Sequence, residues 1–277
     1  MNLFLRDSQR GWLLLGLLVA LLGSVNLTGC ASSTGAGADS VSRADLVTAS
    51  DESSERKRAR IRVELAVGYL EQGKTNIALD EVKLALAADP NFADAYNLRG
   101  LIYMGLNEFS LAQDSFLKAL ALRPRDPNIL HNLGWLMCQQ ARYPEAMAEF
   151  SKALADPAYG ARAKTYMTQG LCQIRAGQRR EAEQSLLKSY ESDPANPVTS
   201  YNLANLLFQN GEVARAQFYI RRLNNSEWAN AQSLWLGIKV ENRIADRVAL
   251  LQLANQLAKR FPQSEEAAAY RRGAFDE

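Results

Sequence analysis

Side chains that could carry out a reaction are few in this sequence of 277 residues. There is one histidine, His131, and there are three cysteines, Cys30, Cys138 and Cys172. Any Ser-His-Asp or Cys-His arrangement would have to use His131, and no HExxH, Walker-type loop, GxGxxG or paired-cysteine metal motif is present. We therefore expect a binding protein rather than an enzyme, with no cofactor and no metal.

Cys30 is the cysteine whose neighbours suggest a reaction of its own. It follows an uncharged apolar run at 11–25, which comes after a short start carrying Arg6 and Arg10. A membrane-spanning helix needs about 20 apolar residues, so this shorter run suits the core of a secretory signal peptide. The small residues before Cys30 would let a peptidase approach, and its thiol could accept an acyl group.

The four residues Leu27-Thr28-Gly29-Cys30 resemble the lipobox of bacterial lipoproteins. The resemblance implies that the signal peptide, 1–29, is removed and that Cys30 is acylated on its sulfur and its new amino group. One acyl chain binds a membrane only marginally, whereas several hold a protein there stably. Ala31, where an aspartate would signal retention in the inner membrane, implies the periplasmic face of the outer membrane. The alternative is an uncleaved anchor with a chance cysteine.

Composition restricts the partners of the mature chain. Residues 1–29 contain two arginines and one aspartate, so the net charge of +2 falls to +1 after cleavage. A value so near zero argues against nucleic acid or a strongly acidic surface as the main partner, because such binding needs a concentrated basic patch. Cys138 and Cys172 are 34 residues apart, which fits neither a redox pair nor a metal site. We expect two small buried side chains there, with a disulfide as the alternative.

The chain divides by composition into four parts. After the signal peptide, 30–50 is rich in Ser, Ala and Gly and predicts a flexible tether behind the acylated cysteine. Helical patterns begin with an N-cap candidate at Ser50 or Asp51 and continue over 51–264. Glu55-Arg56-Lys57-Arg58 is a charge cluster that predicts a solvated helix face. The end of the chain, 265–277, predicts a closing helix and tail.

An internal repeat of 34 residues organises the region 51–264. The segments 93–124 and 127–158 align without gaps, with Gly100, Ala112, Phe116 and Ala119 in phase with Gly134, Ala146, Phe150 and Ala153. This pattern resembles the tetratricopeptide repeat, and the resemblance extends over about 59–262. It implies an all-α superhelix of about six helix–turn–helix repeats whose core forms only on stacking. We expect the small residues at close helix contacts, and Phe116 and Phe150 between neighbouring units.

Groove-facing side chains of the first helices should occupy the fifth, ninth and twelfth positions of each repeat. The first two repeats place five apolar residues there, and we predict that they bind the apolar face of an amphipathic helix: Val63, Val67, Leu70, Leu101 and Met104. Repeats three and four add Trp135, Met167, Leu171 and Ile174. His131, at a fifth position, should contact a partner or solvent. The alternative is that part of the tether covers this groove.

A peptide-clamping subset of these repeats holds a C-terminal carboxylate with Lys, Asn and Arg. Asn97, Asn132 and Asn202 are present in this sequence, but their basic partners are missing. The segment at 221–247 is similar instead to the fifth-to-sixth repeat junction of the type IV pilus biogenesis and stability lipoproteins, the PilF/PilW family. That resemblance implies a pilotin, which binds a secretin subunit and assists its localisation and assembly.

Two other classes of function remain beside the pilotin. One is an envelope scaffold lipoprotein for outer-membrane protein assembly or for activation of a peptidoglycan synthase. The other is an enzyme with a repeat domain attached, and this class is poor because nothing outside the repeats is large enough for a catalytic domain.

Overall fold

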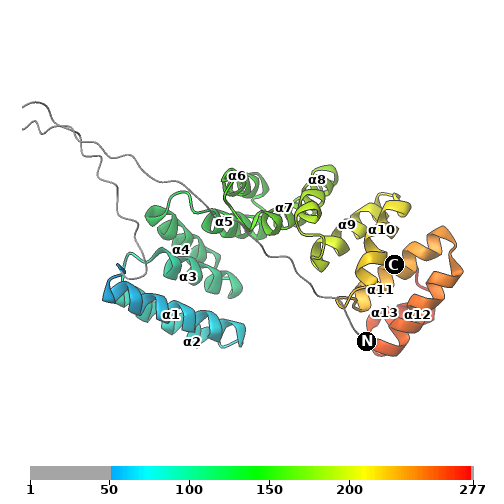
Figure 1. Cartoon of the computed structure of the whole chain (residues 1–277), viewed down its shortest axis with the longest axis horizontal. Helices are drawn as coiled ribbons and strands as arrows, with labels where there is room; N and C mark the ends of the chain where they lie inside the picture. Colours follow the sequence, from blue (N-terminus) through cyan, green and yellow to red (C-terminus); the bar gives the residue numbers. More distant parts are fainter. Residues whose placement is uncertain (1–50, 276–277) are drawn as a thin grey trace, which may run out of the picture. The chain divides into compact units, whose positions relative to one another are not determined.

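In a computed structural model, residues 51–275 are described and form helices with short turns (Figure 1). The predicted signal peptide, Cys30 and the predicted tether lie outside the described residues. The helices are α1 Ser54–Glu71, α2 Thr75–Ala88, α3 Ala93–Gly105, α4 Phe109–Leu122, α5 Pro127–Gln139, α6 Tyr143–Leu154, α7 Arg162–Arg175, α8 Arg179–Ser192, α9 Pro197–Gln209, α10 Val213–Asn224, α11 Ala231–Ile244, α12 Arg247–Arg260 and α13 Glu265–Arg272. No helix within this range is long and apolar enough to cross a membrane.

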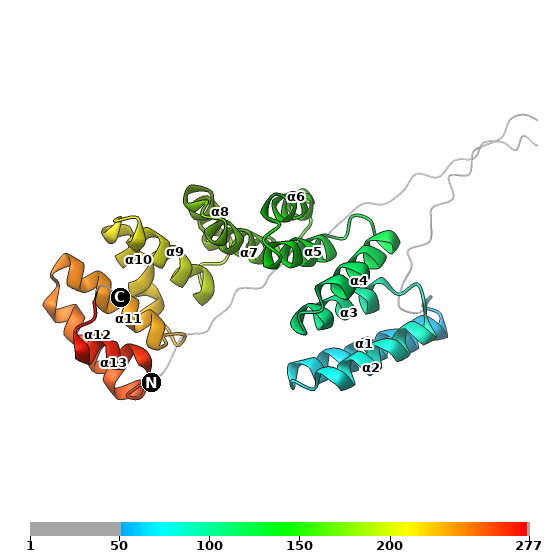
Figure 2. The same cartoon turned by 180° about the vertical axis from the view of Figure 1, so that it is seen from behind.

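The helices pack as six antiparallel pairs, from α1 with α2 to α11 with α12, and α13 follows (Figures 1 and 2). Each first helix also contacts the first helix of the next pair, as α1 does α3 and α5 does α7. These contacts make a tetratricopeptide-repeat superhelix, and the prediction of an all-α fold of six repeats is confirmed. The short α13 packs against both α11 and α12 at the end of the stack.

The turns between paired helices share one backbone feature, which recurs with the period of the sequence repeat. One residue has a positive φ at the same place in each of the first five repeats, namely Gly73, Asn107, Ala141, Gly177 and Gly211. This left-handed conformation ends a helix at low cost when the residue is glycine or asparagine. The non-glycine Ala141 adopts it as well, which indicates that packing of the two helices determines the turn there.

Helix starts depend on capping side chains. Asp126 and Asn196 cap α5 and α9, and each is followed by a proline at the first helical position, where a missing N–H costs nothing. The N-cap of α1 is Ser53, whose side chain accepts a hydrogen bond from the backbone N–H of Arg56. The prediction of Ser50 or Asp51 for this cap was therefore wrong by two or three residues.

Small residues allow the two helices of a repeat to approach closely. A Cβ atom at Gly134 would lie 2.9 Å from the Phe150 ring and 3.2 Å from the backbone oxygen of Ala146. Gly100 faces Phe116 in the same way, and both phenylalanines are fully buried. Phe116 also belongs to one core cluster with Leu133 of the next repeat. The phenylalanines thus fill the space within a repeat as well as the predicted space between repeats.

Candidate protein-binding surface

The five apolar residues predicted for the groove form what we call the apolar strip: Val63, Val67 and Leu70 on α1, and Leu101 and Met104 on α3. The two helices contact each other. Four of the five residues are half-buried, because their side chains also pack against two core clusters, one formed by the first and second repeats and one formed by the second to fourth. Val67 is 41% exposed and is the strip residue most available to a partner.

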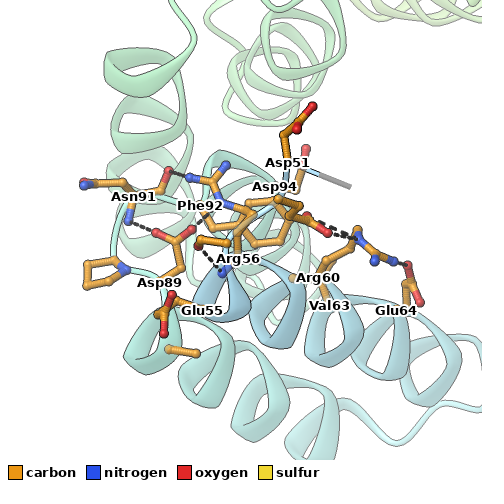
Figure 3. Close-up of a pocket in the computed structure, with 14 residues that line it drawn as sticks. Asp51, Glu55, Arg56, Arg60, Val63, Glu64, Asp89, Asn91, Phe92 and Asp94 are labelled. Carbon is orange, nitrogen blue, oxygen red and sulfur yellow. Dashed lines mark hydrogen bonds and ion pairs between the residues drawn. The ribbon is translucent and has the colours of Figure 1, made fainter. Parts of the chain in front are cut away.

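A cavity of about 940 Å³ lies beside the strip and shares Val63 with it (Figure 3). It opens between the start of α1 and the turn from α2 to α3. The buried Phe92 ring contributes apolar surface, and the Arg56 guanidinium lies 5.0 Å from the centre of that ring. Arg56 is ion-paired with Asp89 and donates a hydrogen bond of 3.3 Å to the backbone oxygen of Asn91. This network fixes one wall of the cavity.

The opposite wall is formed by Arg60 and two carboxylates (Figure 3). The Arg60 guanidinium lies 3.2 Å from the Glu52 carboxylate and 2.8 Å from the Glu64 carboxylate. Both hydrogen bonds raise the pKa of Arg60, and the bond to Glu64 is the larger cause. The charges on both walls are already paired within the chain. The cavity is therefore suited to an apolar side chain of a partner, bordered by polar groups, rather than to a free ion.

One residue of the charge cluster at the start of α1 departs from its prediction, whereas Glu55, Lys57 and Arg58 are exposed as expected. Arg56 belongs to Glu55-Arg56-Lys57-Arg58, which we interpreted as a solvated face, yet it pairs with Asp89 just after α2 and lines the cavity. The pairing partner, Asp89, lies 33 residues further along the chain. No local pattern indicates such a contact, although the 34-residue register places the start of one repeat beside the end of its second helix.

His131 differs from its prediction. It was expected to contact a partner or solvent, but only 5% of its surface is exposed, and its Nδ1 lies 2.9 Å from the hydroxyl of Thr165 on the next first helix. Burial, and secondarily the charge of Lys164, lower the pKa of His131 to about 4. The Tyr159 hydroxyl lies 3.0 Å from the same Thr165 oxygen, so His131 is part of a buried polar network between repeats.

Cys138 and Cys172 are joined by a disulfide bond, and their Cα atoms are 5.8 Å apart. The expectation of two unlinked buried cysteines was wrong, and the alternative was right. The bond connects α5 to α7, the first helices of the third and fourth repeats. Both residues are buried, so the bond fixes the stacking of two repeats rather than exposing a reactive thiol.

The asparagines of the incomplete carboxylate clamp are used within the protein. Asn132 donates a hydrogen bond of 3.0 Å from its side chain to the Asn97 side-chain oxygen, and Asn202 donates one of 2.8 Å to the backbone oxygen of Val198. Residues 51–275 contain no group of three or more His, Cys, Asp or Glu residues that could hold a metal ion. What the groove face offers is therefore apolar and aromatic surface with charged borders, which suits a protein partner.

Known proteins match the chain in sequence and in structure. Tetratricopeptide-repeat family profiles match residues 93–126, 115–148 and 163–196. The type IV pilus assembly protein PilF of Pseudomonas aeruginosa is 30% identical over 204 residues, which are 74% of this chain and 81% of PilF.

Two solved structures extend this relationship. The crystal structure of PilW, described as a widely conserved type IV pilus biogenesis factor, is 31% identical, with a TM-score of 0.69 over 76% of this chain and 97% of PilW. The Pseudomonas aeruginosa PilF structure is 27% identical, with a TM-score of 0.71 over 80% of this chain and all of that one. The chain therefore belongs to the family of tetratricopeptide-repeat proteins that includes PilF and PilW.

Proposed function

We propose that this chain acts in type IV pilus biogenesis as an outer-membrane lipoprotein that binds the secretin subunit and promotes its localisation and multimerisation. The observation that carries the proposal is the relationship to PilF and PilW, which extends over four fifths or more of each relative. The apolar strip supports a role in binding. A repeat scaffold of this kind works by protein–protein interaction and has no need of catalysis.

The proposed partner segment is an amphipathic helix of the secretin. A helix with apolar residues spaced by three and four could lay that face along the apolar strip. Val67 would contribute accessible surface and Met104 an adaptable side chain. Burying two or three partner side chains at roughly 1.5–3 kcal/mol each would supply most of a micromolar affinity after the cost of association.

The proposed anchor is the acylated Cys30 at the periplasmic face of the outer membrane. Cys30→Ala should leave the protein unprocessed or soluble in the periplasm, because the acceptor thiol is lost. Fractionation of membranes and periplasm checks this outcome. Recovery of the wild-type protein mainly from the inner membrane would contradict the proposed sorting.

Deletion of the gene tests the function itself. We expect loss of secretin multimers and of twitching motility, with normal growth, and restoration of both by the wild-type gene. Undiminished secretin multimers would contradict the proposal, and general envelope fragility would favour the scaffold alternative. Co-purification of the secretin with the acylated protein from membranes measures binding directly.

A further inference from the structure

The groove face changes its chemistry after the second repeat. The first helices of the third, fourth and fifth repeats, α5, α7 and α9, contain no aspartate or glutamate, whereas α1 and α3 carry Glu64, Glu71 and Asp94 among others. In α11 the one acidic residue, Glu241, is fully buried and accepts hydrogen bonds from Arg221 and Gln217 of α10. The helices α5, α7 and α9 themselves therefore supply no carboxylate that would neutralise a cation.

Two arginines lie on aromatic rings of neighbouring first helices in this region. The Arg175 guanidinium at the end of α7 lies 4.8 Å from the centre of the Trp135 ring on α5. The Arg243 guanidinium at the end of α11 lies 5.9 Å from the centre of the Phe208 ring on α9. We call these four residues the aromatic–arginine row. The helices that carry them contact in the order α5, α7, α9, α11.

Both arginines are exposed, and within residues 51–275 no salt bridge joins either to a carboxylate. The arginines beside the apolar strip are different, since Arg56 and Arg60 are ion-paired with Asp89, Glu52 and Glu64. A guanidinium held on an aromatic face keeps its N–H groups at the edge, in the planar arrangement that a carboxylate accepts. Lys164, at the opposite end of α7 from Arg175, adds a further positive charge to the same helix.

We propose that the aromatic–arginine row is a second binding surface, and that it takes an extended acidic peptide segment of a partner protein. Charge complementarity selects this partner: the row presents cations without carboxylates, together with aromatic surface for apolar side chains between the acidic ones. A flat lipid bilayer fits poorly on the inner side of a superhelix. Nucleic acid is disfavoured by the net charge of only +2 for the whole chain.

The spacing of the row predicts the spacing of the acidic residues. Arg175 and Arg243 lie two first helices apart, and neighbouring packed helices are about 8–10 Å apart, which gives roughly 16–20 Å between the two arginines. An extended chain rises about 3.3 Å per residue, so two carboxylates about six residues apart would reach both. The surface is separate from the apolar strip and would bind a different segment from the amphipathic helix proposed above.

Fluorescence anisotropy of labelled peptides with the full-length protein tests this surface. The probe is an unstructured peptide with two glutamates six residues apart and leucines between them, and the comparison peptide has glutamines in their place. We expect the acidic probe to bind at least tenfold more tightly. Arg175→Gln with Arg243→Gln should abolish this preference, and circular dichroism should show unchanged helix content because both side chains are exposed.

A matched control removes two charges from outside the row. Arg180→Gln with Arg247→Gln alters exposed arginines at the starts of α8 and α12, which are second helices, and should change the affinity less than twofold. Equal weakening by both double variants would overturn the proposal, because the attraction would then follow net charge alone. An equal affinity for the acidic and glutamine peptides would also overturn it. So would arginine-dependent binding to phosphatidylglycerol vesicles without binding to the peptide.

Discussion

The same three positions of the repeat have different roles in the first and third repeats. In the first repeat the fifth, ninth and twelfth positions are Val63, Val67 and Leu70, which are open or half-buried. In the third repeat they are His131, Trp135 and Cys138. His131 bonds to the next repeat, Trp135 lies under Arg175, and Cys138 forms the disulfide. The backbone register is the same in both, so the choice of side chain decides whether a position is offered to a partner or joins neighbouring repeats.

The first repeat and the central repeats therefore differ in how firmly they are joined to their neighbours. The first repeat has a cavity beside its apolar residues and no covalent link to the second within the described part of the chain. The third and fourth repeats are joined by a disulfide and by a buried polar network. We infer that the N-terminal repeats can adjust to a partner, while the central repeats hold the superhelix in register.

The largest expected effect comes from removing the covalent link in the centre. Replacing both Cys138 and Cys172 by alanine should lower the free energy of unfolding by ~2–4 kcal/mol, because the bond restricts the unfolded chain over a separation of 34 residues. Thermal unfolding followed by circular dichroism measures the change. Reductant should lower the melting temperature of the wild-type protein and leave that of the variant unchanged. A wild-type protein insensitive to full reduction would show that the link does not stabilise the stack.

A large side chain at Gly134 should have the next largest effect. Its Cβ would already approach Phe150 and the Ala146 backbone, so Gly134→Leu overpacks the contact and costs roughly 1–3 kcal/mol. Gly68 of the first repeat has no atom within 4 Å of such a Cβ, so Gly68→Leu should not lower the melting temperature. Equal melting temperatures for the two variants would refute the assigned helix contacts.

At neutral and mildly acidic pH a smaller effect should appear in the pH dependence of stability, and it reaches its full size only near pH 4. The folded protein keeps His131 neutral down to a pKa of about 4, whereas the unfolded chain binds a proton below about 6.5, so stability is lost as the pH falls from 6.5 to 4. The His131→Val variant places in the third repeat the residue type found at the same position of the first repeat, Val63. It removes the contribution of His131 to the pH dependence of stability.

As the pH falls from 7 to 4, the wild-type protein should therefore lose up to about 3 kcal/mol more unfolding free energy than the His131→Val variant. Other carboxylates titrate equally in both proteins and cancel in this difference. Chemical unfolding at several pH values measures it. Parallel pH profiles for the two proteins would mean that His131 is not held neutral by the fold.

The fold could be predicted because small residues recur in phase. Gly100, Gly134 and Gly170 each mark a close helix contact, and chance would not keep them 34 to 36 residues apart. Whether an individual groove position is buried or exposed was harder to predict. The buried His131 contacts Thr165 of the next repeat, and Tyr159, which lies in the longer link between α6 and α7, contacts the same Thr165 hydroxyl. The position of a residue in the repeat predicts the direction of its side chain, and residues of the neighbouring repeats determine whether that side chain is buried.

Pairing between distant residues was the other part that sequence could not provide. Arg56 meets Asp89, and Cys138 meets Cys172, about one repeat apart in each case. Periodicity alone does not distinguish a paired charge from a solvated one, or a disulfide from two buried thiols. The predicted strip residues were recognisable as apolar, but their degrees of exposure follow from how far each also reaches into the core.

The central claim is that the open groove face of the first repeat binds the secretin. Its most direct test compares two equally drastic changes on that repeat. Val67→Asp alters the strip at a position 41% exposed, and Leu84→Asp alters the second helix, α2, at a position 49% exposed. Both variants should retain helical circular dichroism and membrane attachment, since neither side chain is in the core. In a deletion strain, secretin multimers should be lost with Val67→Asp and restored to the wild-type level with Leu84→Asp. Wild-type multimers with Val67→Asp would contradict the claim and place the binding surface elsewhere.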